Sequence, residues 1–289
     1  MRVKNRFTPW LFSMPALAVY LFVVLIPVVW TICLSFFQWD GIAPMKFAGS
    51  GNLQKLVGDQ TFRKAVINNL KFTCISTCYQ FTVGMALAVI LSSVSRGRNL
   101  LKVIYFIPCI IATVALSQIF IKLLALEPMG VFNIVIGKLG FQPRSFLGSP
   151  KTSLVTLAMV DGYKYCGIYM VIFYSAFLSV SQDVLDAAMI DGCGFFNQYR
   201  YIKIPMIKDI CGLVLVMLIN GTLKSFEMPY VLTNGGPGTS SEMVATYMYK
   251  SAFSSMKYGY SSAIAVFLLM ECLLAVSLLR KAVAAGGGE

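Results

Sequence analysis

Long apolar stretches separated by short polar segments dominate this chain. Helical residues rise 1.5 Å each, so a bilayer core of about 30 Å needs about 20 of them. Six blocks reach about that length, and they cover residues 11–36, 66–94, 101–124, 154–180, 210–229 and 263–279. The pattern predicts an all-α, polytopic membrane protein with six transmembrane helices, forming one domain over residues 1–289.

The first block predicts a retained helix. Arg2, Lys4 and Arg6 precede it, as they would in a signal peptide. Its apolar run, however, is longer than the roughly 7–15 residues of a signal-peptide core, and no A-x-A site closes it. Lys and Arg divide almost evenly between the two sets of loops, but the short terminal segments and the turn at 95–102 are the densest. Both termini are therefore expected to be cytoplasmic.

The longer connections are predicted to be folded surface segments rather than linkers. Residues 40–63 and 127–150 carry the Gly, Pro, Asn and Gln typical of turns. Residues 233–238 predict a tight turn, because their glycines permit positive φ and Pro237 bars helix continuation. A short helix is expected after it, over 243–253.

Composition supports the membrane assignment. Hydrophobic residues make up 57% of the chain and charged residues only 12%, about half the roughly 25% of soluble domains. The net charge of +12 lies beside the apolar blocks, which indicates anchoring to anionic headgroups rather than nucleic-acid binding.

Missing residue types exclude several chemistries. The chain has no histidine, no G-x-x-x-x-G-K-[ST] loop and no C-x-x-C pair among its eight cysteines. A Ser-His-Asp triad is therefore impossible, and a metal site is not expected. We expect the chain to be no enzyme and to bind no cofactor itself, so that any ATP is bound by another chain.

The segment at about 181–205, between the fourth and fifth blocks, predicts a helix–glycine–helix hairpin. Ser181 or Asp183 can cap a short apolar helix, and Gly192 can end it in a left-handed conformation. An aromatic-rich second helix follows, and Pro205 marks the turn into the fifth span. Two interpretations are open: an amphipathic hairpin lying on lipid, or a docking surface for another protein.

A spacing pattern in this hairpin resembles the signature of ABC importer permeases, E-A-A, three residues, G, nine residues, I-x-L-P. Here Asp186-Ala187-Ala188 is followed by three residues and Gly192, and nine more residues lead to Ile202-Lys203-Ile204-Pro205. Asp186 replaces Glu and Ile204 replaces Leu; every spacing fits.

The resemblance extends over nearly the whole chain. Phe106-Ile107-Pro108 looks like the family's pattern in the third span. Residues 232–238, Leu-Thr-Asn-Gly-Gly-Pro-Gly, and 258–263, Tyr-Gly-Tyr-Ser-Ser-Ala, look like the carbohydrate branch, close to maltose- and glycerol-phosphate-type permeases.

The resemblance implies a type I importer permease fold in the cytoplasmic membrane of a bacterium or archaeon. It implies a second, different permease chain, two ATPase subunits that bind ATP and Mg²⁺, and an extracellular or periplasmic solute-binding protein that delivers a sugar. The hairpin would be the coupling helix, with these ATPase-coupling residues: Asp186, Ala187, Ala188, Gly192, Phe195, Phe196, Ile202 and Pro205.

Ionisable groups inside two spans are candidates for a solute path. Asp161 and Lys164 lie three residues apart, and Lys224 and Glu227 repeat the arrangement. Sugars need hydrogen bonds and aromatic faces, so the substrate-path candidates are Tyr163, Lys164, Asn220, Phe226, Glu227 and Tyr230. Weaker candidates are Asn68, Asn69, Gln80 and Gln118. The alternative is that each charged pair is a structural ion pair.

Two other functions compete with the permease. An ion-gradient-driven secondary transporter could use Asp161 and Glu227 as its proton or cation groups. An intramembrane enzyme is disfavoured, because the chain has neither H-E-x-x-H nor G-x-S-x-G.

Overall fold

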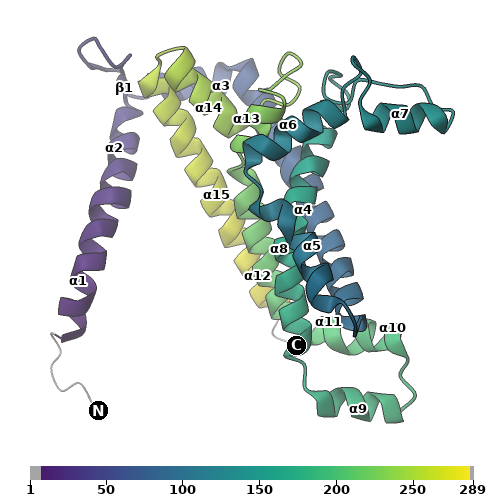
Figure 1. Ribbon diagram of the computed structural model, residues 1–289. Helices are drawn as coiled ribbons and strands as arrows, with labels where there is room; N and C mark the ends of the chain where they lie inside the picture. Colours follow the sequence, from purple (N-terminus) through teal and green to yellow (C-terminus); the bar gives the residue numbers. More distant parts are fainter. Residues whose placement is uncertain (1–7, 287–289) are drawn as a thin grey trace. The chain divides into compact units, whose positions relative to one another are not determined.

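The computed structural model describes residues 8–286, and these fold almost entirely into helices (Figure 1), as predicted. The two-residue strands β1 (Phe37–Gln38) and β2 (Lys46–Phe47) form a small antiparallel pair. Arg2, Lys4 and Arg6 lie outside the described residues. The chain divides into two compact units: residues up to Gln60 with Met248–Leu269, and Thr61–Tyr247 with the residues from Met270 onward.

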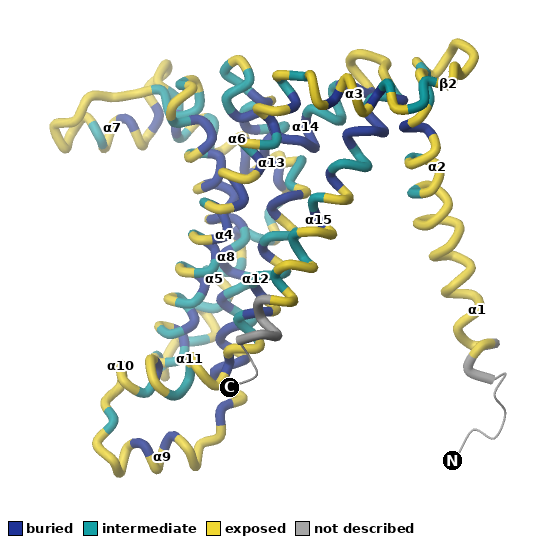
Figure 2. Tube along the Cα trace, turned by 180° about the vertical axis from the view of Figure 1, so that it is seen from behind, coloured by how far each residue is buried: buried dark blue, intermediate teal, exposed yellow. Residues whose placement is uncertain are grey.

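The first unit contains the predicted first span. Helix α1 (Thr8–Tyr20) continues through a π-helical turn (Leu21–Leu25) into α2 (Ile26–Leu34), so the apolar pattern of this block is confirmed as helix. Most of its described side chains are exposed within the single chain (Figure 2). Such a surface requires lipid or another protein around it.

The connection that follows in the first unit is a folded surface. A short helix not expected from the sequence, α3 (Gly51–Gly58), lies within it. The buried Asn52 amide holds α3 in place by donating to Ser35 O and Phe37 O, both at 2.8 Å. Asp40 accepts hydrogen bonds from Ile42 N and Ala43 N, which hold the pKa of its carboxyl below its usual value.

The second unit is a bundle of packed helices. Its long helices run side by side in Figure 1, and two buried apolar clusters fill the space between them. The elements are α4 (Gln60–Ser93), α5 (Arg98–Ile110), α6 (Thr113–Leu123), α7 (Val131–Lys138), α8 (Ser153–Leu178), α12 (Lys208–Leu223) and α13 (Glu227–Leu232). Helix α7 is another element that the turn-like composition of 127–150 did not predict.

Two later elements follow the sequence expectation. Residues 233–238 form a turn in which Gly235 and Gly238 have φ of 78° and 61°. The expected helix after it is confirmed as α14 (Val244–Tyr249), which continues as a π-helical turn (Lys250–Ser254). The last span is α15 (Tyr258–Gly286).

Small residues set the packing distance around α8. A Cβ added at Gly84 of α4 would lie 3.1 Å from the Cβ of Tyr169 and 3.3 Å from Cys166 O. A Cβ at Gly167 would clash with Tyr105 O on α5. Close helix contact through glycine is a common device in membrane bundles, where lipid supplies no hydrophobic drive between helices.

Two of the predicted spans are not continuous helices. The third is divided into α5 and α6, which meet at 95°. The fifth stops at Leu223 and resumes at Glu227. Within the described residues, three helices are long and apolar enough to cross a membrane alone, Phe12–Leu34, Gln60–Ser93 and Tyr258–Lys281, or up to five if each bent pair is one span. The count of six stays a prediction.

Replacing Gly167 by Ala is expected to loosen the α5–α8 contact, because the added methyl meets backbone that cannot move aside. Overpacking of this kind costs about 1–3 kcal/mol. Gly221→Ala is the matched control, since no heavy atom lies within 4 Å of a Cβ there. Thermal unfolding in detergent should show a lower midpoint for Gly167→Ala alone; equal midpoints would contradict the tight contact.

Candidate functional site

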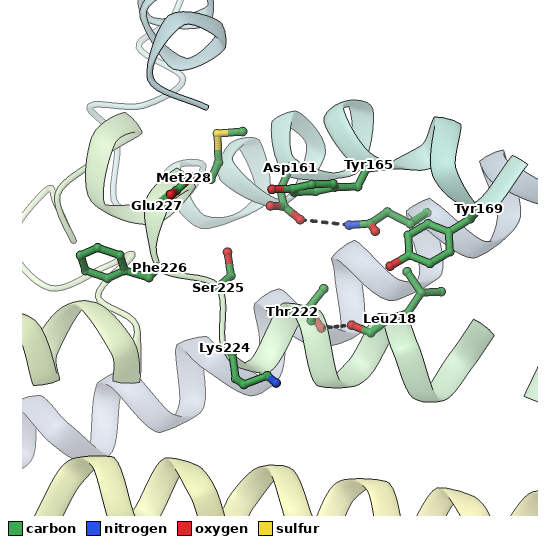
Figure 3. Close-up of a pocket in the computed structure, with 12 residues that line it drawn as sticks. Asp161, Tyr165, Tyr169, Leu218, Thr222, Lys224, Ser225, Phe226, Glu227 and Met228 are labelled. Atoms are coloured by element: carbon green, nitrogen blue, oxygen red, sulfur yellow. Dashed lines mark hydrogen bonds between the residues drawn. The ribbon is translucent and has the colours of Figure 1, made fainter. Parts of the chain in front are cut away.

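A polar cavity of about 330 Å³ opens within the second unit beside the broken fifth span. Figure 3 shows its labelled lining residues converging from α8, from α12 and from the segment that joins α12 to α13. The lining residues are Gln80, Asp161, Tyr165, Tyr169, Leu218, Gly221, Thr222, Lys224, Ser225, Phe226, Glu227 and Met228.

One face of α8 forms a wall of this cavity. Asp161, Tyr165 and Tyr169 are spaced four residues apart, so they lie above one another on a single helical face (Figure 3). Asp161 is almost fully buried, and its Oδ2 accepts a 3.0 Å hydrogen bond from Gln80 Nε2 on α4. The wall therefore offers a carboxylate, an amide and two aromatic rings.

The opposite wall is the non-helical stretch 224–226. Lys224 is its first residue and Glu227 follows it; both are exposed, and within the described residues neither makes an ion pair or a hydrogen bond. The Lys224–Glu227 ion pair, the alternative to a solute-path role, is therefore not formed among the described residues. Irregular backbone at membrane depth is tolerated where it borders a cavity, and both charged groups are available to a solute or to a partner chain.

A buried amide secures the end of α12 at this break. Asn69 of α4 donates from Nδ2 to Leu223 O at 3.1 Å, and to Glu271 Oε2 at 3.4 Å. Leu223 is the last residue of α12, so its carbonyl has no partner in the next helical turn. Asn69, a weak candidate for the solute path from sequence, thus has a structural contact.

Lys164 does not line the cavity. Its Nζ donates to Ile111 O and to Thr113 Oγ1, both at 2.8 Å, and the side chain is 4% exposed. Ile111 directly follows α5, and Thr113 begins α6. The ammonium group therefore stabilises the break in the third span by bonding to the residues on both sides of it. Among the described residues, Asp161 and Lys164 form no ion pair.

The other substrate-path candidates also divide into residues that line the polar cavity and residues that do not. Phe226 and Glu227 line the cavity, and Tyr230 stacks on Phe226 with ring centroids 5.2 Å apart. Asn220 is not among the lining residues. Tyr163 packs edge-on against Phe120, 5.6 Å away, and borders a different, apolar cavity. Tyr163 lies 200° around the helix from Asp161, so the two cannot share a wall.

Sequence reasoning missed several lining residues. Tyr169, Thr222 and Ser225 were not proposed, although all three carry hydroxyls at the cavity. For Tyr169 a signal existed: the four-residue spacing from Asp161 through Tyr165 identifies one face of α8. No comparable signal pointed to Ser225, because its exposure depends on the break.

The predicted hairpin is a distinct structure at one end of the bundle (Figure 1). Helix α9 (Gln182–Ile190) is followed by a turn in which Gly192 has φ of 76°. The second arm is α10 (Phe195–Asn197), a π-helical stretch (Gln198–Lys203) and α11 (Ile204–Met206). The helix–glycine–helix prediction is confirmed. Pro205 lies inside α11 rather than at its end, because proline fits the first turn of a helix.

The expected coupling residues divide between the two faces of the hairpin. Ala188 is buried and Ile202 half-buried. The other six, Asp186, Ala187, Gly192, Phe195, Phe196 and Pro205, are exposed. The exposed apolar surface includes Ile190 at 87% and Phe196 at 82%. Exposed apolar patches of this kind are typical of surfaces that bind another protein or a membrane.

A buried tyrosine attaches the hairpin to the bundle. Tyr199, 5% exposed, shares a hydrogen bond with Ser92 at the end of α4. Its ring packs edge-on against Phe177 of α8, 5.2 Å between centroids, and Lys203 Nζ lies 4.3 Å from its centroid. The hairpin and the ends of α4 and α8 are thus mechanically connected.

The two features define a class of protein. A chain with membrane-crossing helices, a polar cavity at a broken span and an exposed hairpin has the parts of a transport protein. The cavity offers hydrogen-bonding groups and aromatic faces to a polar solute.

Comparisons with known proteins agree with this class. The chain is 32% identical over 282 residues to the probable ABC transporter permease protein YurN of Bacillus subtilis, covering 96% of each chain. It is 26% identical to the trehalose/maltose transport system permease protein MalF of Thermococcus litoralis, covering 91% of this chain and 89% of that one. No protein-family model matches the chain.

Among solved structures, the fold matches a chain of a bacterial ABC transporter that imports the acidic polysaccharide alginate. The TM-score is 0.83 at 21% identity, over 96% of this chain and 95% of that one. The chain belongs to the family of ABC transporter permeases and has their fold. It is a multi-pass membrane protein.

Replacing Lys164 by Met is expected to destabilise the protein and leave solute preference unchanged. The substitution keeps the apolar stem but leaves Ile111 O without its buried donor, which costs about 1–3 kcal/mol. Lys122→Met, at an exposed position in the last turn of α6, is the control. Thermal unfolding measures the first effect, and competition among related solutes measures the second. Altered ranking of solutes with unchanged stability would place Lys164 in the solute path instead.

Proposed function

We propose that this chain is the transmembrane subunit of an ATP-driven importer for a sugar or sugar-like solute. The observation that carries the proposal is the exposed hairpin with the E-A-A-type spacing, held on a helical bundle that encloses a polar cavity. The names of the relatives support the solute class, since trehalose, maltose and alginate are all carbohydrates.

In this proposal the hairpin couples ATP hydrolysis to the spans. The exposed Ile190 and Phe196 fit an apolar groove on a separate ATPase subunit. Force applied there reaches α4 and α8 through Tyr199, because its ring and hydroxyl contact both helices. A rigid connection of this kind suits rocking of a helix bundle about a central site.

The assembly that follows contains two permease chains, this one and a second, different one, with two ATPase subunits. ATP and Mg²⁺ bind to the ATPase subunits, and this chain binds no cofactor. An extracellular or periplasmic binding protein delivers the solute. The hairpin then faces the cytoplasm, so both termini are cytoplasmic and the protein lies in the cytoplasmic membrane of a bacterium or archaeon. A structure of the alginate transporter with a periplasmic protein that holds an alginate pentasaccharide supports this kind of partner.

The solute path in this proposal runs through the polar cavity. Glu227, Lys224 and Ser225 supply hydrogen-bonding groups that face it, and Tyr165 and Phe226 supply aromatic faces. A sugar presents hydroxyls at its edges and C–H groups on its ring faces, so this mixture is complementary to it. The proposed path leaves out Lys164 and Tyr163, because neither lines this cavity.

Replacing Gly192 by Val tests the coupling role. The added side chain meets no atom within 4 Å, but a β-branched residue at φ of 76° is strained. The strain of about 1–2 kcal/mol corresponds to a shift of roughly 5–30-fold in the population of the correct turn. Gly194→Val is the control, because Gly194 has φ of −71° and equally open surroundings.

The measurements are co-purification of the ATPase subunit and sugar uptake in membranes. Both should fall for Gly192→Val and stay near wild type for Gly194→Val, with membrane insertion unchanged for both. Wild-type values for Gly192→Val would mean that the hairpin lies on lipid and does not couple.

Replacing Glu227 by Gln tests the solute path. If the carboxylate accepts a hydrogen bond from one sugar hydroxyl, exchanging this charged acceptor for the weaker, neutral amide oxygen of Gln costs about 0.5–1.5 kcal/mol. That is a several-fold to tenfold loss of apparent affinity, confined to sugars that carry the hydroxyl. Glu127→Gln, an exposed position that does not line the cavity, is the control.

The experiment is a competition series with related sugars, with uptake normalised to assembled complex. Unequal effects across the series support the path. A uniform fall that follows lost assembly would show that Glu227 contacts the second permease, and the permease function itself would stand.

A further inference from the structure

A second cavity in the same unit has a different character. It has a volume of about 760 Å³ and lies among α6, α7, α8 and the segment before α8. Apolar side chains form most of its walls, including Phe120, Phe146 and Met159. Its size is in the range of ligand pockets, which is about 300–1,000 Å³. The sugar path proposed above does not use it.

The cavity is built from ordered contacts. The fully buried Asn133 of α7 donates from Nδ2 to Ala125 O at 2.9 Å and accepts from Arg144 N at 3.0 Å. Thr152 donates from Oγ1 to Phe146 O at 2.7 Å. These bonds connect α7, the end of α6 and the start of α8. The cavity between these elements, called the slot below, is therefore preformed.

Two cations stand at this slot with no acid among its lining residues. They are Arg144 and Lys151, both exposed, and within the described residues neither makes an ion pair. The guanidinium carbon of Arg144 lies 5.6 Å from the ring centroid of Phe146, so the charge sits directly over the apolar wall. The site therefore combines positive charge with a mostly apolar cavity.

The adjacent α7 has the surface of an element that lies in a membrane interface. Its side chains Val131, Phe132 and Val135 are 57%, 49% and 50% exposed. Residues 122–151 contain four cations and a single acid, Glu127. An apolar exposed helix with basic flanks partitions to the boundary between headgroups and acyl chains.

We propose that this cavity is a binding site for an anionic phospholipid. One acyl chain occupies the slot between α6 and α8, and the headgroup phosphate lies against Arg144 and Lys151. The complementarity of charge selects an anionic lipid over a neutral one, and the apolar lining selects a lipid over a free phosphate or a soluble anion.

The test uses the assembled transporter, purified in a neutral detergent and stripped of lipid. Native mass spectrometry then follows titration with phosphatidylglycerol or phosphatidylcholine of identical acyl chains. Wild type should bind phosphatidylglycerol at least tenfold more tightly. Each cation near a headgroup contributes about fivefold to affinity, so Arg144→Gln with Lys151→Gln should remove the preference and leave phosphatidylcholine binding unchanged.

Two further variants separate the slot from general surface charge. Lys122→Gln with Lys138→Gln removes two nearby cations that do not line the cavity, and it should leave the lipid preference intact. Met159→Trp fills the slot and should weaken both lipids. Inorganic phosphate at millimolar concentration should not displace the lipid, because it lacks an acyl chain.

Three results would overturn the proposal. Equal binding of the two lipids by wild type would remove the role of charge. An equal loss of preference in the control pair would assign the effect to the surface as a whole. The third result has two parts: wild type binds no lipid, and the variant Met159→Cys forms a disulfide with a cysteine of a partner subunit. Together they would show that a protein segment occupies the slot.

Discussion

The structure depends on one constraint: backbone groups freed by a broken helix inside a membrane need partners from within the protein. Two spans are broken here, after Ile110 and after Leu223. In both, a polar side chain from another helix supplies the donor. Lys164 of α8 binds Ile111 O, and Asn69 of α4 binds Leu223 O. Each donor stabilises its break, because lipid offers none.

These breaks explain where the polar cavity lies. The stretch 224–226 leaves the helical path, so Lys224, Ser225 and Glu227 line the cavity beside the α8 face. The α8 face that carries Asp161 and Tyr165 meets them there. A continuous fifth helix would have placed Lys224 and Glu227 on its own surface as an i, i+3 pair.

Close packing around α8 connects this cavity to the hairpin. Glycines at 84 and 167 let α4 and α5 approach α8 closely enough that the three share one buried cluster. Tyr199 enters the same cluster from the hairpin. Displacement of the hairpin is therefore transmitted to the helices that form the cavity walls, since close-packed interiors are hardly compressible.

The helical class, the positions of the apolar blocks and the hairpin around Gly192 could all be predicted from the sequence. These follow from local properties: the length of an apolar run, glycine's tolerance of positive φ, and fixed spacings along the chain. Two other features become visible in the folded chain alone: Lys164 bonds to the break in the third span rather than to Asp161, and Tyr163 and Phe226 border different cavities. Both depend on residues far away in the sequence. A helix can break, and a buried charge can be paired, where another helix supplies a hydrogen-bonding group at the same level of the bundle.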